Sequence, residues 1–193
     1  MKKLIVAITG ASGVIYAKRL LEILSQEDFL IHLTISEAGA VIIKNELDIE
    51  INLTDFQFES LIGFPTNNIY HHFSDITAAI SSGSYKTEGM VIVPCSMNTL
   101  GAIAAGISNN LIHRAADVCI KENRKLVLVP RETPLSSIHL KNMLKLSKLG
   151  VCILPAMPGF YHKPQTISEQ VDFIICKILD QFGIENNLIR RWE

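Results

Sequence analysis

The stretch LIVAITGASGVIYAKRLLEIL, residues Leu4–Leu24, predicts the fold class. Its first part, Leu4–Ile8, is a continuous apolar run, which is typical of a strand covered on both faces. Gly10–Gly13 allows a tight turn, and Val14–Leu24 then places its leucines on one face of a helix. A buried strand, a glycine turn and an amphipathic helix in this order indicate the start of a βαβ unit in a parallel sheet.

The same alternation continues along the chain. Further strands are predicted at Leu30–Ile35, Met90–Val93, Leu126–Val129 and Val151–Leu154, with Pro94 ending the third of the five. Strands that are apolar on both faces and alternate with helices belong to a parallel sheet with helices on each side. The sequence therefore predicts an α/β fold, a single-domain doubly wound parallel sheet that is flavodoxin-like or Rossmann-like, over residues 1–193.

The helices are predicted from the apolar periodicity between these strands. One begins at Glu37 with Ser36 as its cap, and the others cover Thr99–Gly106, Leu111–Glu122, Ile138–Leu149 and Ser168–Phe182. Residues 66–85 are expected to be irregular, apart from a short helical stretch around Ile76–Ile80.

The composition excludes two classes of protein. With 193 residues, of which 48% are hydrophobic, the chain is not a disordered protein. Eighteen Lys and Arg against nineteen Asp and Glu give a net charge of -1, whereas a non-specific nucleic-acid binder carries a basic excess. No nucleic-acid partner is expected, and the weakly charged, apolar composition favours a homo-oligomer.

The compartment predicted is the cytoplasm. The four cysteines form no CxxC pair, so they are interpreted as thiols rather than as zinc ligands or disulfides. The apolar run Leu4–Ile8 is too short for a signal peptide. The segment Met90–Ile107 is interrupted by Pro94 and by polar residues, so no membrane span is expected.

Ligands of doubly wound sheets bind beyond the carboxyl ends of the strands, so the residues there are the candidates for function. After the first strand, the N–H groups of Gly10–Gly13 open a helix and favour an anion, and the Ser12 hydroxyl is placed to relay a proton. The alternative is a tight turn without a ligand. Ser36 is interpreted as a helix cap or as a ligand contact.

The segment after the third strand, Cys95–Thr99, places small polar groups at another helix N-terminus, which suits an anion or the edge of a heteroaromatic ring. Cys95 has no neighbouring His or Lys to activate it, so a packed thiol is favoured over a nucleophile.

Charged residues follow the fourth strand directly. Arg131 can clamp a phosphate and Glu132 can act as an acid or base, although a surface ion pair between them is the alternative. Arg114 and Lys121, seven residues apart on one predicted helix, offer two positive charges to a phosphate, unless Arg114 pairs with Asp117 instead.

Aromatic and histidine residues complete the candidates. Tyr161, in the loop after the fifth strand, is interpreted as an anion or π contact, or as a tyrosine packed on the surface. His71 and His72 are adjacent but lack further ligands at suitable spacing, so they are interpreted as loop histidines and no metal site is expected.

Several of these runs together resemble the UbiX-type flavin prenyltransferases. They are GASG (Gly10–Gly13), SEAG (Ser36–Gly39), PCSMNTL (Pro94–Leu100), RAADV (Arg114–Val118), PRETPL (Pro130–Leu135) and GFYHKPQ (Gly159–Gln165). The resemblance runs from Lys3 to Trp192. It implies a homododecamer that holds FMN at subunit interfaces and needs no metal. The implied activity transfers a dimethylallyl group from dimethylallyl phosphate to N5 and C6 of reduced FMN. The prenylated FMN then serves a UbiD-type decarboxylase, commonly in ubiquinone biosynthesis or in the decarboxylation of aromatic acids.

The resemblance also implies roles for individual residues. The FMN contacts would be Gly10, Ala11, Ser12, Ser36, Ser96, Met97, Asn98, Thr99 and Arg131. The contacts with dimethylallyl phosphate would be Tyr161, Lys177, Arg114, Lys121 and Trp192. Proton transfer would fall to Glu132, Ser12 and Glu46.

One position departs from the family pattern, because Lys177 stands where relatives have arginine. Lysine keeps the positive charge but loses the planar fork of arginine, so a different phosphate geometry is expected. Two rival functions stay open. One is an FMN-dependent decarboxylase of a cysteine-containing substrate, which calls for a catalytic histidine, and the other is a non-catalytic flavin carrier.

Overall fold

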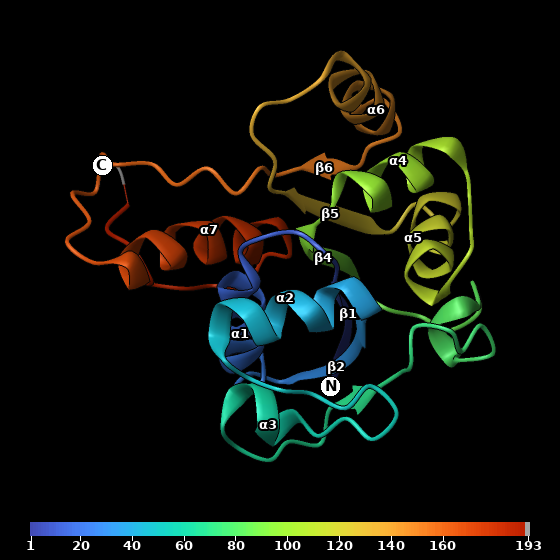
Figure 1. Ribbon diagram of the computed structural model, residues 1–193, viewed down its shortest axis with the longest axis horizontal. Helices are drawn as coiled ribbons and strands as arrows, with labels where there is room; N and C mark the ends of the chain where they lie inside the picture. The colour runs from blue at the N-terminus through green and yellow to red at the C-terminus, as the bar shows by residue number, and fades with distance from the viewer. Residues whose placement is uncertain (192–193) are drawn as a thin grey trace.

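The computed structural model describes residues 1–191, and its centre is a parallel sheet of six strands in the order β3-β2-β1-β4-β5-β6 (Figure 1). The strands are β1 (Lys2–Ile8), β2 (Phe29–Ile35), β3 (Ile69–Tyr70), β4 (Gly89–Cys95), β5 (Lys125–Pro130) and β6 (Cys152–Ile153). The helices are α1 (Val14–Leu24), α2 (Glu37–Leu47), α3 (Phe58–Ile62), α4 (Met97–Ala105), α5 (Leu111–Lys121), α6 (Ser137–Ser147) and α7 (Ile167–Gln181).

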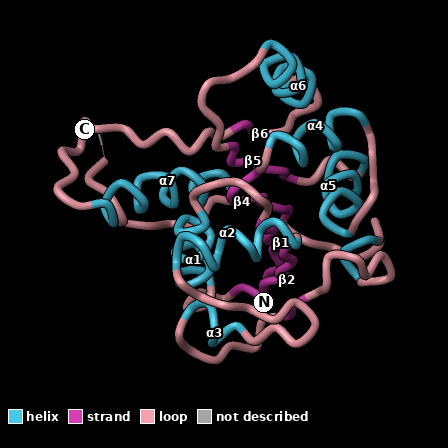
Figure 2. The backbone as a smooth tube through the Cα atoms, in the orientation of Figure 1, coloured by secondary structure: helices cyan, strands magenta, loops and turns pink. Residues whose placement is uncertain are grey.

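Helices cover both faces of the sheet, as Figure 2 shows. Leu4, Val6 and Ile8 of β1 join the core that contains residues of α1, α2, α3 and α7. The residues between them, Ile5 and Ala7, join the core under α4, α5 and α6. Burial on both sides explains why the strands are continuous apolar runs, and the predicted doubly wound α/β fold is confirmed.

The sheet has one strand more than the five predicted. β3 pairs only with His32 and Leu33 of β2 and is two residues long, which is too short to leave a periodic signal. β4 runs on through Pro94 to Cys95, so the prediction that Pro94 ends this strand was wrong. Pro94 lacks an N–H group, but its carbonyl still accepts hydrogen bonds from the neighbouring β1 end.

Cap residues set where several helices begin. Ser96 caps α4, which therefore starts at Met97, two residues before the predicted Thr99. Thr166 caps α7, which starts at Ile167, one residue before the predicted Ser168. The five-residue α3 was not predicted. The helical stretch expected around Ile76–Ile80 consists of turns and a single 3₁₀ turn at Ala79–Ser81. Among residues 1–191, no helix is long and apolar enough to cross a membrane.

Candidate functional site

The carboxyl ends of β1, β2 and β4 are tied to one another by hydrogen bonds. The Thr9 hydroxyl donates to the Pro94 carbonyl at 2.8 Å and accepts from the Ser96 N–H at 2.8 Å. The Ser36 N–H donates to the carbonyl oxygen of Ile8 at 3.0 Å. Thr9 is itself buried, so these bonds are shielded from water and hold three loops in one fixed arrangement.

Two glycines allow these loops to approach so closely. A Cβ on Gly10 would lie 2.4 Å from the Cβ of Ala38, and a Cβ on Gly39 would lie 2.8 Å from the carbonyl oxygen of Ile8. Neither distance is tolerated between real atoms, so GASG and SEAG can pack together only with glycine at these positions.

The N-terminus of α1 already holds a carboxylate. Oε2 of Glu46, at the end of α2, accepts hydrogen bonds from the N–H groups of Gly13 at 2.9 Å and Val14 at 3.2 Å. The sequence predicted an anion at this helix start, and the anion present there belongs to the chain itself. Glu46 thus lies beside the loop that carries Ser12, two segments that the sequence separates by more than thirty residues.

The N-termini of α2 and α4 are capped by serine side chains. Ser36 accepts from the N–H of Gly39, and Ser96 accepts from the N–H of Thr99 while donating to the Thr99 hydroxyl. Each cap satisfies one of the N–H groups that a helix leaves unpaired at its start. Six further N–H groups at this edge have no partner within the described part of the chain. They belong to Gly10, Ser12, Glu37, Ala38, Met97 and Asn98.

This group of unpaired N–H donors fits FMN, which carries a phosphate and two ring carbonyl oxygens that need hydrogen-bond donors. The arrangement is rigid because the loops are cross-linked, so it can hold a flat ring in one orientation. Ser12, Ser36 and Ser96, which the family resemblance implies as FMN contacts, all lie at this edge.

A second cluster follows β5 and β6. Arg131 and Glu132 are exposed and line one small pocket together with Met143, Pro155 and Met157. Among the ion pairs of residues 1–191, none joins Arg131 to Glu132, so the alternative of a surface pair is not supported.

The two cations of α5 lie elsewhere in the same chain. Arg114 pairs with Asp117 at 2.8 Å, as the alternative interpretation expected, and also donates to the Ser81 carbonyl. Lys121 pairs with Glu122 at 2.8 Å beside Gly83, near the amino end of the sheet. Glu132 follows the opposite end of β5, and a six-residue strand spans about 20 Å. One copy of the chain therefore does not bring Lys121 to Glu132.

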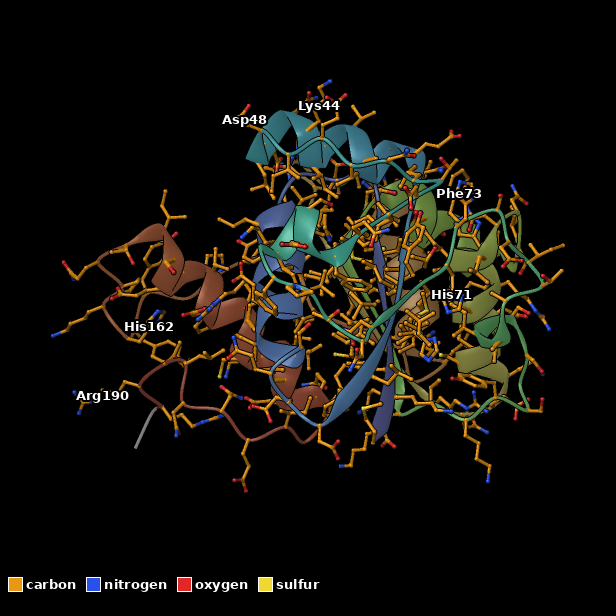
Figure 3. All side chains as sticks on the ribbon, turned by 90° about the horizontal axis from the view of Figure 1, so that it is seen from below. Lys44, Asp48, His71, Phe73, His162 and Arg190 are labelled. Carbon is orange, nitrogen blue, oxygen red and sulfur yellow. The ribbon has the colours of Figure 1, made fainter. Side chains whose placement is uncertain are left out.

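Tyr161 and Lys177 do come together, on the ring of Phe173 in α7. The Tyr161 ring lies edge-on to Phe173 at 5.7 Å between centroids, and Nζ of Lys177 lies 5.7 Å from the same centroid. His162 stacks on Phe173 at 5.3 Å, and Figure 3 shows His162 at the α7 end of the molecule, together with Arg190. Sequence reasoning missed Phe173, whose contacts depend on the path of the loop after β6.

The cysteine and histidine candidates are packed into the fold or tied to it by side-chain contacts. Cys95 is fully buried and burial raises the pKa of its thiol, which confirms the interpretation as a packed thiol. The His71 ring nitrogen lies 2.8 Å from that of His32 in β2, so this loop histidine is tied to the sheet. No cluster of metal-ligating side chains exists among residues 1–191. Trp192 lies outside the described residues.

Comparison with known proteins agrees with this geometry. Residues 1–179 match the family model described as Flavoprotein. A flavin prenyltransferase UbiX of Halalkalibacterium halodurans is 50% identical over 188 residues, which cover 97% of this chain and 91% of that protein. A flavin prenyltransferase UbiX of Pseudomonas aeruginosa is 46% identical over 99% of this chain and 94% of its own length.

Solved structures are similar over the same length. A dodecameric FMN-dependent UbiX-like decarboxylase from Escherichia coli O157:H7 is 44% identical, with a TM-score of 0.89 and 99% of each chain covered. The AnUbiX protein in complex with FMN and dimethylallyl pyrophosphate is 38% identical, with a TM-score of 0.90 over 100% of this chain and 97% of that one. The peptidyl-cysteine decarboxylase EpiD is 21% identical with a TM-score of 0.60, a likeness of fold alone.

Proposed function

The chain belongs to the Flavoprotein family and, within it, to the UbiX-type flavin prenyltransferases, and from this premise we propose how its residues perform the transfer. The enzyme transfers a dimethylallyl group to reduced FMN and makes prenylated FMN. The observation that carries this function is the full-length identity of about half with flavin prenyltransferases, on a sheet edge rich in unpaired donors. We propose that residues 1–193 form one flavoprotein domain.

FMN, when bound, supplies the nucleophilic N5 and C6 atoms. We assign its binding to the loops at the ends of β1, β2, β4 and β5, through Gly10, Ala11, Ser12, Ser36, Ser96, Met97, Asn98, Thr99 and Arg131. The unpaired N–H groups of these loops and the fixed spacing between Thr9, Pro94 and Ser96 support this assignment.

The leaving phosphate needs fixed positive charge. Tyr161 and Lys177 are the contacts that one copy provides, and their common contact with Phe173 supports this pairing. Trp192 is proposed to close the site from the C-terminus. The phosphate itself would sit beside the Lys177 ammonium, and the apolar aromatic surroundings would exclude water from the dimethylallyl cation.

We propose that Arg114 and Lys121 reach this phosphate from a neighbouring copy. Within one chain Lys121 lies near the end of the sheet opposite Glu132, so a shared site needs a second chain. The similar protein from Escherichia coli is described as dodecameric, which supports a homododecamer with the site at subunit interfaces. The exposed apolar side chains of α6 support further contacts between copies.

Proton transfer is assigned to three residues. Glu132 donates a proton to the departing phosphate, which makes it a better leaving group. Ser12 and Glu46 accept the proton that ring closure releases. Oε2 of Glu46 is engaged at Gly13 and Val14, whereas Oε1 makes no hydrogen bond within the described residues and is available for this proton.

The decisive experiment gives the purified protein reduced FMN and dimethylallyl phosphate and measures the flavin by mass spectrometry. The expected product is heavier than FMN by one five-carbon unit. Glu132→Gln should bind FMN but lose turnover, whereas a flavin carrier would be indifferent to this change. An unmodified flavin with FMN binding verified, or release of carbon dioxide from a cysteine peptide, would contradict the proposal.

Mixing two inactive variants tests the shared site. Glu132→Gln and Lys121→Gln place their defects on different copies, so a refolded mixture contains some sites with both groups intact. We expect activity to return to about a quarter of the wild-type level, by random pairing of chains across two-copy sites. Equal inactivity of the mixture and of each variant would place both residues in one copy. The product would serve a UbiD-type decarboxylase in the cytoplasm, in ubiquinone biosynthesis or in the decarboxylation of aromatic acids.

A further inference from the structure

The end of α7 carries an ion pair that the proposed reaction does not use. Arg191 donates two hydrogen bonds to Asp180, from Nη1 to Oδ2 at 3.0 Å and from Nη2 to Oδ1 at 2.7 Å. This paired geometry is the strongest that arginine forms with a carboxylate. Asn186 adds a contact of 3.4 Å to Oδ1, so both carboxylate oxygens of Asp180 are occupied.

Asp180 lies three residues after Lys177 on the same helix, which is the spacing at which opposite charges pair. No ion pair joins Lys177 to Asp180 within residues 1–191, although the pKa of Asp180 is lowered, first by its hydrogen bond with Arg191 and more weakly by the charge of Lys177. The carboxylate is therefore held by Arg191 in preference to its helical neighbour.

Arg191 also lies in the neighbourhood of the proposed phosphate contacts. Asp180, which binds Arg191, lies one helical turn from Lys177 on α7, and Lys177 and Tyr161 both contact the ring of Phe173. Tyr161, Lys177 and Arg191 thus share one small region at α7. The segment after α7 turns back along this helix to bring Arg191 there (Figure 1).

We infer that Arg191 is a positioning residue for the phosphate of the prenyl donor, because it takes up the Asp180 carboxylate and leaves the Lys177 ammonium free. Without Arg191, Asp180 pairs with Lys177 and also repels the incoming phosphate. A lysine ammonium is a compact charge, so an ion pair with one carboxylate largely neutralises it. Asp180 and the donor phosphate would therefore compete for the Lys177 ammonium. The inference rests on the proposed function, in which Lys177 binds this phosphate.

The test compares Arg191→Gln with the double variant Arg191→Gln/Asp180→Asn. We expect the single change to raise the KM for dimethylallyl phosphate about tenfold, with kcat changed less than about twofold, because binding of the donor is weakened equally in the ground state and in the transition state. The double variant removes the competing carboxylate and should return KM to within about threefold of wild type. A merely structural role of Arg191 would not be rescued by a second change.

Arg190→Gln is the matched control. Arg190 is the adjacent arginine, is exposed and forms no ion pair within the described residues, and Figure 3 shows it at the margin of the molecule. It should leave KM unchanged. A double variant as weak as Arg191→Gln, or Arg191→Gln as active as Arg190→Gln, would overturn the inference.

Binding of inorganic phosphate, measured by calorimetry on the FMN-loaded protein without turnover, separates this inference from the proposed function. We expect the wild-type protein to bind phosphate most tightly, the double variant almost as tightly, and Arg191→Gln most weakly. If the wild-type protein modifies no flavin but keeps this order, the proposed reaction fails and the role of Arg191 stands. If it modifies flavin and the order is absent, the role of Arg191 fails alone.

Discussion

Helices α6 and α7 differ in how much of their apolar surface the chain itself covers. α7 buries seven residues against α1 and the sheet, whereas Leu146 is the one buried residue of α6. On α6, Ile138, Leu140 and Leu144 are 67%, 53% and 56% exposed. Figure 1 shows α6 at the margin of the molecule, while α7 lies along α1. It follows that α7 is stabilised within one chain, whereas the exposed apolar residues of α6 are suited to contact with another copy.

The largest effect is expected from a charge on the exposed face of α6. Leu144→Asp places a carboxylate in the proposed contact between copies, where it would lose its water without gaining a partner. We expect the assembly to dissociate in sedimentation velocity and the prenylation rate to fall about 100-fold, since a desolvated unpaired charge costs several kcal/mol. Ile167→Asp, which charges an even more exposed residue of α7, should leave the mass of the assembly unchanged. Intact oligomers of Leu144→Asp would remove the distinction between the two helices.

A large effect on stability is expected instead from α7. Ile175 is fully buried, so Ile175→Ala should lower the free energy of unfolding by about 2–5 kcal/mol through lost contacts and a residual cavity. Urea unfolding at protein concentrations too low for assembly measures this loss. Leu144→Ala on α6 is the comparison and should change the same free energy by less than about 0.5 kcal/mol. Similar losses at both positions would show that α6 is held as firmly as α7.

An intermediate effect is expected from two histidines buried on one face of the sheet, because they make the stability depend on pH. His32 and His113 are buried on the face that carries α4, α5 and α6, and burial lowers both pKa values, that of His32 to about 4. The folded chain therefore binds fewer protons than the unfolded chain between pH 6.5 and about 4. Stability is fully present above this window and is lost as the pH falls through it, by about 1.4 kcal/mol per pH unit for each histidine that titrates on unfolding.

His32→Asn checks this origin of the acid sensitivity. The slope of the unfolding free energy against pH should become shallower in the variant, whatever its stability at neutral pH. His72→Asn changes a histidine that hydrogen-bonds to Ser74 in an exposed turn and should keep the wild-type slope. An unchanged slope in His32→Asn would assign the sensitivity to other groups.

The smallest effect is expected from the helix caps. Thr166 and Ser136 each cap a helix in the same reciprocal arrangement, with Glu169 and with His139. Thr166→Ala should lower the global unfolding free energy by about 1 kcal/mol, because α7 unfolds only with the core. Ser136→Ala should instead speed hydrogen exchange of the α6 amides alone, because α6 can open locally. Faster exchange throughout the chain in Ser136→Ala would tie α6 to the core.

The sequence predicted those parts of the molecule that repeat a local pattern. The runs that became β1, β2, β4 and β5 are apolar because both faces of the sheet are buried, so their existence could be predicted from single residues and their neighbours. β3 and α3 are too short for any period, so they were missed. Cap residues moved the helix starts by one or two positions, since one side-chain hydrogen bond decides them.

Some features of the candidate site could likewise be predicted from the sequence, and others could not. Residues directly after strands, such as Ser36 and Ser96, could be predicted because the topology itself brings strand ends to one edge. The bond of Glu46 to the Gly13 N–H joins residues that no local pattern relates. The separation of Lys121 from Glu132, in contrast, follows from the order of the predicted elements, because Lys121 precedes the strand that became β5 and Glu132 follows it.

The Glu46 carboxylate at α1 has a consequence for how a flavin can enter. At this edge, the N-terminus of α1 binds the Glu46 carboxylate and α2 carries Glu37 in its first turn, whereas the first turn of α4 has no acidic residue. The phosphate of an FMN bound at the proposed site would therefore be least disfavoured at α4. If FMN binds at the proposed site, a carboxylate of the chain itself would thus influence which end of the flavin lies beside α1.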